Sequence, residues 1–173
     1  MLRWAVCHQN GPVAIRYPRG GNRQLTKSAW KNQPEVAQSS LLSVEAAGTD
    51  AMIVTYGVLT ENALLAAKLL EQDGFSVGVA RLLSVAPIPV QALAEAMGKC
   101  RSLIVIEECC AGCGIKEALG WQIKATMPDC RVHGIDLGEG FIRHGDMKSL
   151  YKHYGLDGDS LADRIKEVVQ VEK

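Results

Sequence analysis

The segment that decides the fold reads AMIVTYGVLTENALLAAKLLEQDG and spans residues 51–74. Its first six residues are a continuous apolar run of strand length, and Gly57 ends that run. Thr60 is in position to cap a helix, and Gly74 is in position to close it. Between them, apolar residues recur at helical spacing, at Ala63, Ala66, Ala67 and Leu70. The segment therefore predicts a buried strand followed by an amphipathic helix.

The same alternation of strand and helix continues along the rest of the sequence. Apolar runs predict strands over residues 75–85, 102–106 and 131–137. Helical spacing predicts helices through Ala92–Ala96, over Ile115–Ala125, through Met147–Tyr154, and from Ser160, which forms a capping-box-like start with Asp163, to Val169. This alternation predicts an α/β fold, a three-layer αβα sandwich over residues 46–171 with a mostly parallel sheet. Residues 36–44 are the candidate for an edge strand.

Composition restricts the classes of function. The 173 residues include 19 basic and 19 acidic side chains, so net charge gives no electrostatic case for nucleic acid or for an anionic membrane. No apolar run approaches the roughly 20 residues that a membrane helix needs. The first residues do not form the apolar core of a signal peptide. We therefore expect a cytoplasmic protein with no nucleic-acid or membrane partner.

Near the start of the sequence, residues 11–20 read GPVAIRYPRG. Val13, Ile15 and Tyr17 alternate with less apolar residues, which predicts a strand that Pro18 cannot continue. Arg19 would therefore lie just past the carboxyl end of that strand, where ligands bind in open α/β sheets and where its planar fork of donors matches a phosphate. On the residues alone, the simpler interpretation is an edge strand with two solvated arginines.

This ten-residue run resembles the signature that closes the pyrimidine-binding domain of the 1-deoxy-D-xylulose-5-phosphate synthase family, which belongs to the thiamine-diphosphate-dependent transketolases. The resemblance implies a five-stranded mixed sheet in which residues 36–44 are the antiparallel strand. It divides the chain into a remnant of the preceding domain (1–22), a linker with an edge strand (23–45) and a transketolase C-terminal-like domain (46–173). It places the phosphate of glyceraldehyde 3-phosphate on Arg19 and assigns no ligand to Arg16.

The family's remaining requirements are absent from this sequence. Its diphosphate–magnesium motif, Gly-Asp-Gly followed by Asn, and its pyrimidine-side Glu belong to upstream domains, and neither occurs here. The resemblance therefore implies a carboxyl-terminal section that binds no cofactor alone, contributes no catalytic residue and is inactive alone. Thiamine diphosphate, magnesium, the other domains and a homodimer partner would complete the parent enzyme. The alternatives are the β-type subunit of a 2-oxo-acid dehydrogenase or transketolase, and a non-catalytic association module.

Three of the six cysteines follow the predicted strand at residues 102–106. Cys109, Cys110 and Cys113 stand in the sequence EECCAGCG, where the resembled family has a glycine-rich turn. A Cys-x-x-Cys spacing is found in redox and metal sites, but no second pair accompanies it here. The interpretation we favour is that these are small buried thiols in place of Gly or Ala, reduced and free of metal.

Overall fold

The structure is a computed structural model that describes residues 5–7, 11–17 and 41–171. Its five strands are β1 (Leu42–Ala46), β2 (Ala51–Thr55), β3 (Val77–Leu82), β4 (Ser102–Ile106) and β5 (Arg131–Ile135). They form one sheet in the order β1-β3-β2-β4-β5, in which only β1 is antiparallel to its neighbour. The predicted mostly parallel sheet with one antiparallel edge strand is confirmed, although that strand begins and ends later than predicted.

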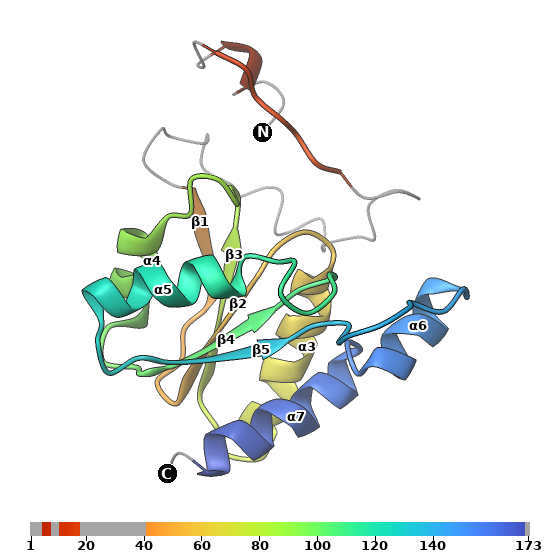
Figure 1. The fold of residues 1–173 in the computed structure, drawn as a ribbon. Coiled ribbons are helices and arrows are strands. Elements are labelled where there is room, and N and C mark those ends of the chain that lie inside the picture. Colours follow the sequence, from red (N-terminus) through yellow and green to blue (C-terminus); the bar gives the residue numbers. More distant parts are fainter. Residues whose placement is uncertain (1–4, 8–10, 18–40, 172–173) are drawn as a thin grey trace.

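Helices cover both faces of this sheet, as Figure 1 shows. On one face lie α3 (Leu59–Gln72) and α7 (Gly158–Val171), with α6 (Met147–Tyr154) beside them. On the other face lie α4 (Val90–Met97) and α5 (Lys116–Thr126). Because β2 and β4 are buried on both sides, every residue of these two strands is buried, including the apolar ones that alternate between the two cores. The three-layer αβα sandwich is confirmed.

The helix boundaries follow capping contacts that the sequence interpretation placed differently. Gly74 does close α3, because the amide of Gly74 donates to Glu71 and the amide of Phe75 donates to Leu70, as in a Schellman motif. Thr60 is not the N-cap, since it lies inside the first turn of α3 and its hydroxyl donates to the carbonyl of Gly57.

The observed start of α7 also differs from the predicted start at Ser160. Its side-chain cap is Asp157, whose Oδ1 accepts from the amide of Ser160 at 3.3 Å, so the predicted box of Ser160 with Asp163 does not begin this helix. A side-chain oxygen on the residue just before a helix can accept a hydrogen bond from the backbone amide three residues later, which has no partner within the helix. Here the turn comes directly after α6, which ends at Tyr154 with Gly155 as its C-cap, so α7 begins at Gly158, two residues earlier than Ser160.

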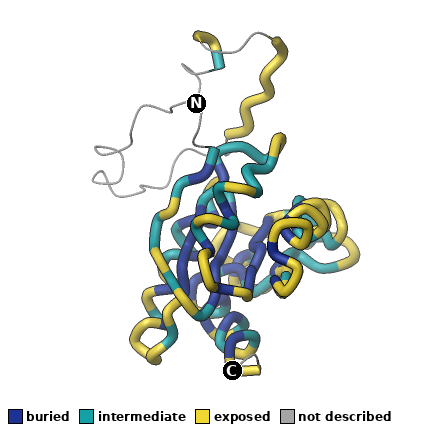
Figure 2. The backbone as a smooth tube through the Cα atoms, turned by 90° about the vertical axis from the view of Figure 1, so that its left-hand side faces the viewer, coloured by how far each residue is buried: buried dark blue, intermediate teal, exposed yellow. Residues whose placement is uncertain are grey.

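The strand predicted for residues 13–17 does not form in the structure. Residues 5–7 are helical, but residues 11–17 are exposed and pair with no strand of the part of the chain that the structure describes. Figure 2 shows them in yellow, away from the dark blue interior of the sheet. The alternation of Val13, Ile15 and Tyr17 is typical of a strand, yet a strand forms only where a neighbour accepts its backbone hydrogen bonds. Arg19 and all of residues 23–40 lie outside the described residues.

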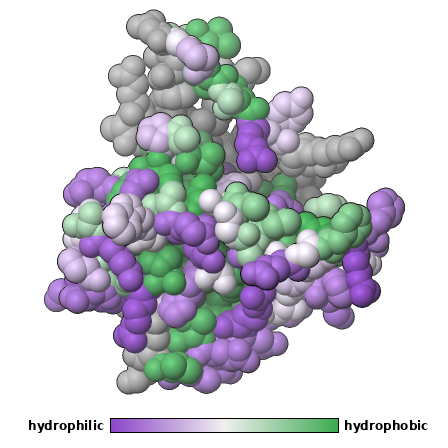
Figure 3. All heavy atoms as spheres, in the orientation of Figure 1, coloured by the Kyte–Doolittle hydropathy of each residue, from purple (hydrophilic) through white to green (hydrophobic). Residues whose placement is uncertain are grey.

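The surface carries scattered apolar residues. Trp121 and Phe141 have exposed fractions of 83% and 97%. On the face seen in Figure 3, apolar residues are interspersed with polar ones over the helices. Among the described residues, none of the helices is both long enough and apolar enough to span a bilayer.

Candidate functional site

The carboxyl edge of the sheet contains a point where neighbouring connections diverge. The strands β2 and β4 are adjacent and parallel, but the chain leaves β2 for α3 on one face and leaves β4 for α5 on the other. A crevice at such a point is the usual ligand position in open α/β sheets. Tyr56 follows β2 and Glu107 follows β4, so these two side chains meet there, with the Tyr56 hydroxyl donating to Oε1 of Glu107 at 3.1 Å.

Glu107 is the central group of this site, and only 3% of it is exposed. Besides the Tyr56 hydroxyl, Oε1 accepts from the amide of Ile115 at 2.7 Å, and Oε2 accepts from the amide of Lys116 at 3.1 Å. These two amides belong to the start of α5, where backbone donors have no partner within the helix. The carboxylate therefore satisfies the first amides of α5 and places its negative charge at the positive end of the helix dipole.

The close approach of Glu107 to this helix depends on Gly114. A Cβ atom at residue 114 would lie 2.2 Å from Oε2 of Glu107 and 2.4 Å from Oε1. No side chain fits at that distance. The glycine-rich loop is thus explained by two different needs, since Gly112 has a φ of +74° in a turn, whereas Gly114 leaves room for a buried carboxylate.

Tyr56 is held in its neutral form. Burial is the largest cause that raises the pKa of its phenol far above the usual value, followed by the charge of Glu107 and its hydrogen bond to that carboxylate. The charge of Arg16 acts in the opposite direction. The phenol is therefore a permanent hydrogen-bond donor near neutral pH. Together with the two amides, it gives Glu107 three hydrogen-bond donors, which fix this carboxylate between the end of β2 and the start of α5.

Further contacts fasten the loop between β4 and α5 to the end of β5. The amide of Leu137 donates to the carbonyl of Cys109, and the amide of Ala111 donates to the carbonyl of Gly138, both at 3.0 Å. Glu108 accepts from the hydroxyl of Tyr151 on α6 at 2.5 Å. The neighbouring carboxylates Glu107 and Glu108 thus have separate tasks, one toward α5 and one toward α6.

The three loop cysteines differ from one another in exposure. Cys109 and Cys110 are half-buried, but Cys113 is exposed, so the expectation of buried thiols is wrong for Cys113. A tight turn keeps this residue at the surface, because Gly112 and Gly114 on either side bring no apolar cover. Burial, and then the charges of Glu107 and Asp136, raise the pKa of Cys109 to about 11. Cys109 is therefore a protonated thiol at neutral pH.

This raised pKa predicts slow alkylation of Cys109. At pH 8 we expect iodoacetamide to modify Cys109 at least about a hundredfold more slowly in the folded chain than in urea, because only the thiolate reacts and its fraction falls tenfold for each unit of pKa. Mass spectrometry of the tryptic peptide 102–116 measures the rate. In the folded chain the rate should rise as the pH approaches 11. Equal rates at pH 8 in the folded and unfolded chain would contradict this assignment.

The described residues do not fit a diphosphate–magnesium site. They contain no group of three or more His, Cys, Asp or Glu side chains placed to hold a metal ion. At the crevice, Glu107 already accepts three hydrogen bonds, and its charge opposes an anionic ligand. We therefore derive no step of thiamine chemistry from these residues. That this chain alone binds no cofactor stays a prediction.

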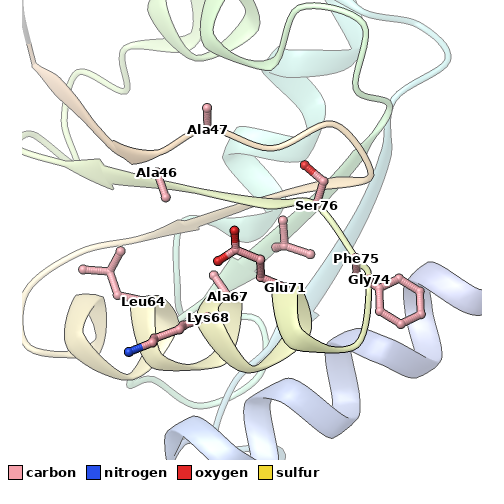
Figure 4. Close-up of a pocket in the computed structure, with 10 residues that line it drawn as sticks. Ala46, Ala47, Leu64, Ala67, Lys68, Glu71, Gly74, Phe75 and Ser76 are labelled. Carbon is pink, nitrogen blue, oxygen red and sulfur yellow. The ribbon is translucent and has the colours of Figure 1, made fainter.

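A groove lies at the opposite, amino edge of the sheet. It is an open groove of about 550 Å³ between α3 and the chain around the ends of β1 and the start of β3. Figure 4 shows small side chains such as Ala46, Ala47 and Ala67 along it, with the Glu71 carboxylate pointing from α3 into the groove. It has no convergent set of polar groups beyond the exposed residues Lys68, Glu71 and Ser76, and it does not contact the Glu107 site.

The sequence analysis singled out Arg19, just past the strand predicted for residues 13–17, as the ligand-binding residue and assigned no role to Glu107. Arg19 lies outside the described residues. Arg16 is exposed, and its charge acts on Tyr56, so the part of the motif that is described lies near enough to the crevice to influence it. The signal that would have found Glu107 is an acidic residue directly after a buried strand and eight residues before a glycine-preceded helix start.

The sheet order, the single antiparallel edge strand and the helices on both faces define a three-layer α/β domain with the contact between Tyr56 and Glu107 at its carboxyl edge. Residues 42–161 match the family described as the C-terminal domain of transketolase. The chain therefore belongs to the transketolase C-terminal domain family. The matched range begins at the first residue of β1 and ends within α7, so it includes the whole sheet.

Curated relatives confirm the resemblance stated from the motif. The chain is 31% identical over 168 residues to 1-deoxy-D-xylulose-5-phosphate synthase of Chlorobium phaeovibrioides, and 31% identical over 181 residues to that of Clostridium kluyveri. These alignments cover 96% and 99% of this chain but only 26% of each relative. The chain thus spans about a quarter of the length of the curated relatives it matches.

Solved structures support the fold. A split-gene transketolase, described as an inactive beta4 tetramer, superposes with a TM-score of 0.65 at 24% identity and covers 81% of this chain and 47% of that one. A transketolase mutant from Pichia stipitis superposes with a TM-score of 0.56 at 18% identity, over 77% of this chain and 18% of that one.

Proposed function

We propose that this chain is the carboxyl-terminal section of a 1-deoxy-D-xylulose-5-phosphate synthase-like transketolase, which joins pyruvate to glyceraldehyde 3-phosphate with loss of CO2. The observation that carries the proposal is the match to such synthases along 96% of the chain. The complete motif in residues 11–20 supports it, since this run is the part of the sequence most specific to these enzymes. In this proposal the chain supplies Arg19 to the substrate phosphate, packing against the other domains and part of a homodimer interface.

The described site is consistent with a supporting part in catalysis. Its buried carboxylate holds a helix and a loop in fixed positions at the ligand-facing edge. Thiamine diphosphate, when bound in the parent enzyme, supplies the carbanion chemistry, and we place it with magnesium on the upstream domains. The catalytic residues of the reaction are likewise placed outside this chain.

A second candidate is a β-type subunit that carries this domain on a separate chain. The split-gene transketolase favours it, because a protein of similar fold is there described as a separate, inactive beta4 tetramer. The two candidates differ in whether the diphosphate motif lies in the same reading frame. The genomic sequence immediately upstream of Met1 discriminates between them, because Gly-Asp-Gly followed by Asn would appear either in frame or in an adjacent reading frame. If the chain is a non-catalytic association module, the motif should be absent from both places.

The experiment that tests the proposed function uses the assembled protein. The chain is produced together with the upstream gene segment, and 1-deoxyxylulose 5-phosphate is measured with pyruvate, glyceraldehyde 3-phosphate, thiamine diphosphate and magnesium. We expect product only when both parts are present. An assembly that binds this chain and the cofactor but accepts only other acceptor substrates would contradict the synthase assignment and leave the family membership intact.

For this chain alone we predict no cofactor binding and no turnover of pyruvate. The reason is that the sequence lacks the diphosphate motif and the acidic groups at the crevice are engaged in structural contacts. Isothermal titration calorimetry with thiamine diphosphate and magnesium should give no saturable heat. The assembled enzyme serves as the positive control. Micromolar binding to the isolated chain would show that it contains a cofactor site.

A further inference from the structure

The loop between β4 and α5 places two cysteines at the ends of one tight turn. The amide of Cys113 donates to the carbonyl of Cys110 at 3.0 Å, which closes a four-residue turn. Gly112, in the third position, has a φ of +74°, while Ala111 in the second position does not have a positive φ. This combination is typical of a type II turn, which holds the Cα atoms of its end residues within about 7 Å. A disulfide joins Cα atoms about 4.4–6.8 Å apart, so the backbone already has the required closeness.

Accessibility favours this pair over the third cysteine of the loop. Cys113 is an exposed free cysteine and Cys110 is half-buried beside it. Neither side chain takes part in the three hydrogen bonds that Glu107 accepts, which come from Tyr56, Ile115 and Lys116. Cys109 differs, because Glu107 and Asp136 oppose the charge of its thiolate. A small disulfide molecule therefore has better access to Cys113 than to the other two thiols of the loop. Cys110 then supplies the second thiol, from the other end of the same turn.

We propose that Cys110 and Cys113 form a thiol–disulfide couple that exchanges with low-molecular-weight disulfides. In the first step, the Cys113 thiolate attacks one sulfur of a disulfide such as oxidised glutathione, and one glutathione leaves as its thiolate. In the second step, the Cys110 thiolate attacks Sγ of Cys113 and releases the second glutathione thiolate. The two cysteines lose two electrons and two protons, and one glutathione disulfide becomes two glutathione thiols. Under a reducing thiol pool the same steps run in reverse.

The couple is independent of the proposed function, because it rests on the loop geometry alone. Closing it adds a bond across a turn that already exists, next to the hydrogen bond between Ala111 and Gly138. We therefore expect the oxidised chain to keep its fold and the capping of α5 by Glu107. The bond would restrict part of the loop between the end of β4 and the start of α5, which has no regular secondary structure.

The test is a redox equilibration of the full chain. Reduced protein is incubated under nitrogen with mixtures of reduced and oxidised glutathione, quenched with acid and unfolded in urea, so that all remaining thiols, including Cys109, are alkylated for mass spectrometry. We expect the tryptic peptide 102–116 to lose two alkylation sites as oxidised glutathione is raised, with Cys110 linked to Cys113 and Cys109 still alkylated. Reduction with dithiothreitol should restore both sites.

Two matched variants complete the test. In Cys110→Ser, the first step can occur but the second cannot, so a glutathione adduct on Cys113 should accumulate. In Cys109→Ser, the link between Cys110 and Cys113 should form as in the unchanged chain. Circular dichroism checks that each variant is folded, and the unchanged chain alone already decides the proposal. A link that involves Cys109, mixed disulfides without an internal link, or complete alkylation of the peptide at high oxidised glutathione would each overturn it.

Discussion

Replacement of Glu107 by alanine is expected to lower the free energy of unfolding by about 3–5 kcal/mol. The carboxylate is buried and accepts from the amides of Ile115 and Lys116 and from the hydroxyl of Tyr56. Its removal leaves these three donors without an acceptor, and each unsatisfied buried donor costs about 1–3 kcal/mol, part of which water entering the cavity recovers. Urea unfolding followed by circular dichroism measures the loss through the shift of the transition midpoint.

Neighbouring variants separate this effect from a general loss of charge. Glu108→Ala removes an exposed carboxylate that accepts from the hydroxyl of Tyr151, so we expect a much smaller loss. Tyr56→Phe removes one of the three donors and leaves the other two bonds, and it should cost about 1 kcal/mol. Gly114→Ala keeps the carboxylate but drives a Cβ into it, and it should be as destabilising as Glu107→Ala. Equal stability of Glu107→Ala and Glu108→Ala would refute the capping role.

Replacement of Arg19 by alanine in the assembled enzyme is expected to lower kcat/KM for glyceraldehyde 3-phosphate about ten- to a hundredfold, mainly through a higher apparent KM. Two observations support this expectation. The guanidinium stays charged at all relevant pH, and the position matches the phosphate-contacting Arg of the resembled family. A charge-assisted contact to phosphate is worth roughly 1.5–3 kcal/mol, which is the origin of the expected range.

Pyruvate is the internal control for this variant. It carries no phosphate, so its apparent KM should change little. Arg16→Ala is the matched variant on the same segment, with the same loss of charge and no expected effect on glyceraldehyde 3-phosphate. If Arg16→Ala abolished the dependence on glyceraldehyde 3-phosphate and Arg19→Ala left it untouched, the assignment would belong to the other arginine. If neither variant had an effect, the arginines would be solvated residues of a structural segment.

The regular elements of the domain were predictable because each has a strong local signal. The strand predicted at residues 51–56 is a continuous apolar run, and the helix that follows has apolar residues at consistent helical spacing. The predicted ends of both elements therefore lie within one or two residues of the observed ends. The end of this helix at Gly74 was predictable because few other residues adopt its positive φ. The helix starts were less predictable, since α3 begins at Leu59 without a side-chain cap, and α7 is capped by Asp157 and not by Ser160.

By itself, the sequence determined the order of strands and helices, the buried character of β2 and β4, and the resemblance to a family that the comparisons confirm. These properties depend on residues close together in the chain. Only the tertiary structure decided what Glu107 does, because its partners come from the end of β2 and from residues eight and nine positions later. It also decided that residues 11–17 are unpaired here, since a strand needs a neighbouring strand, which local spacing cannot supply.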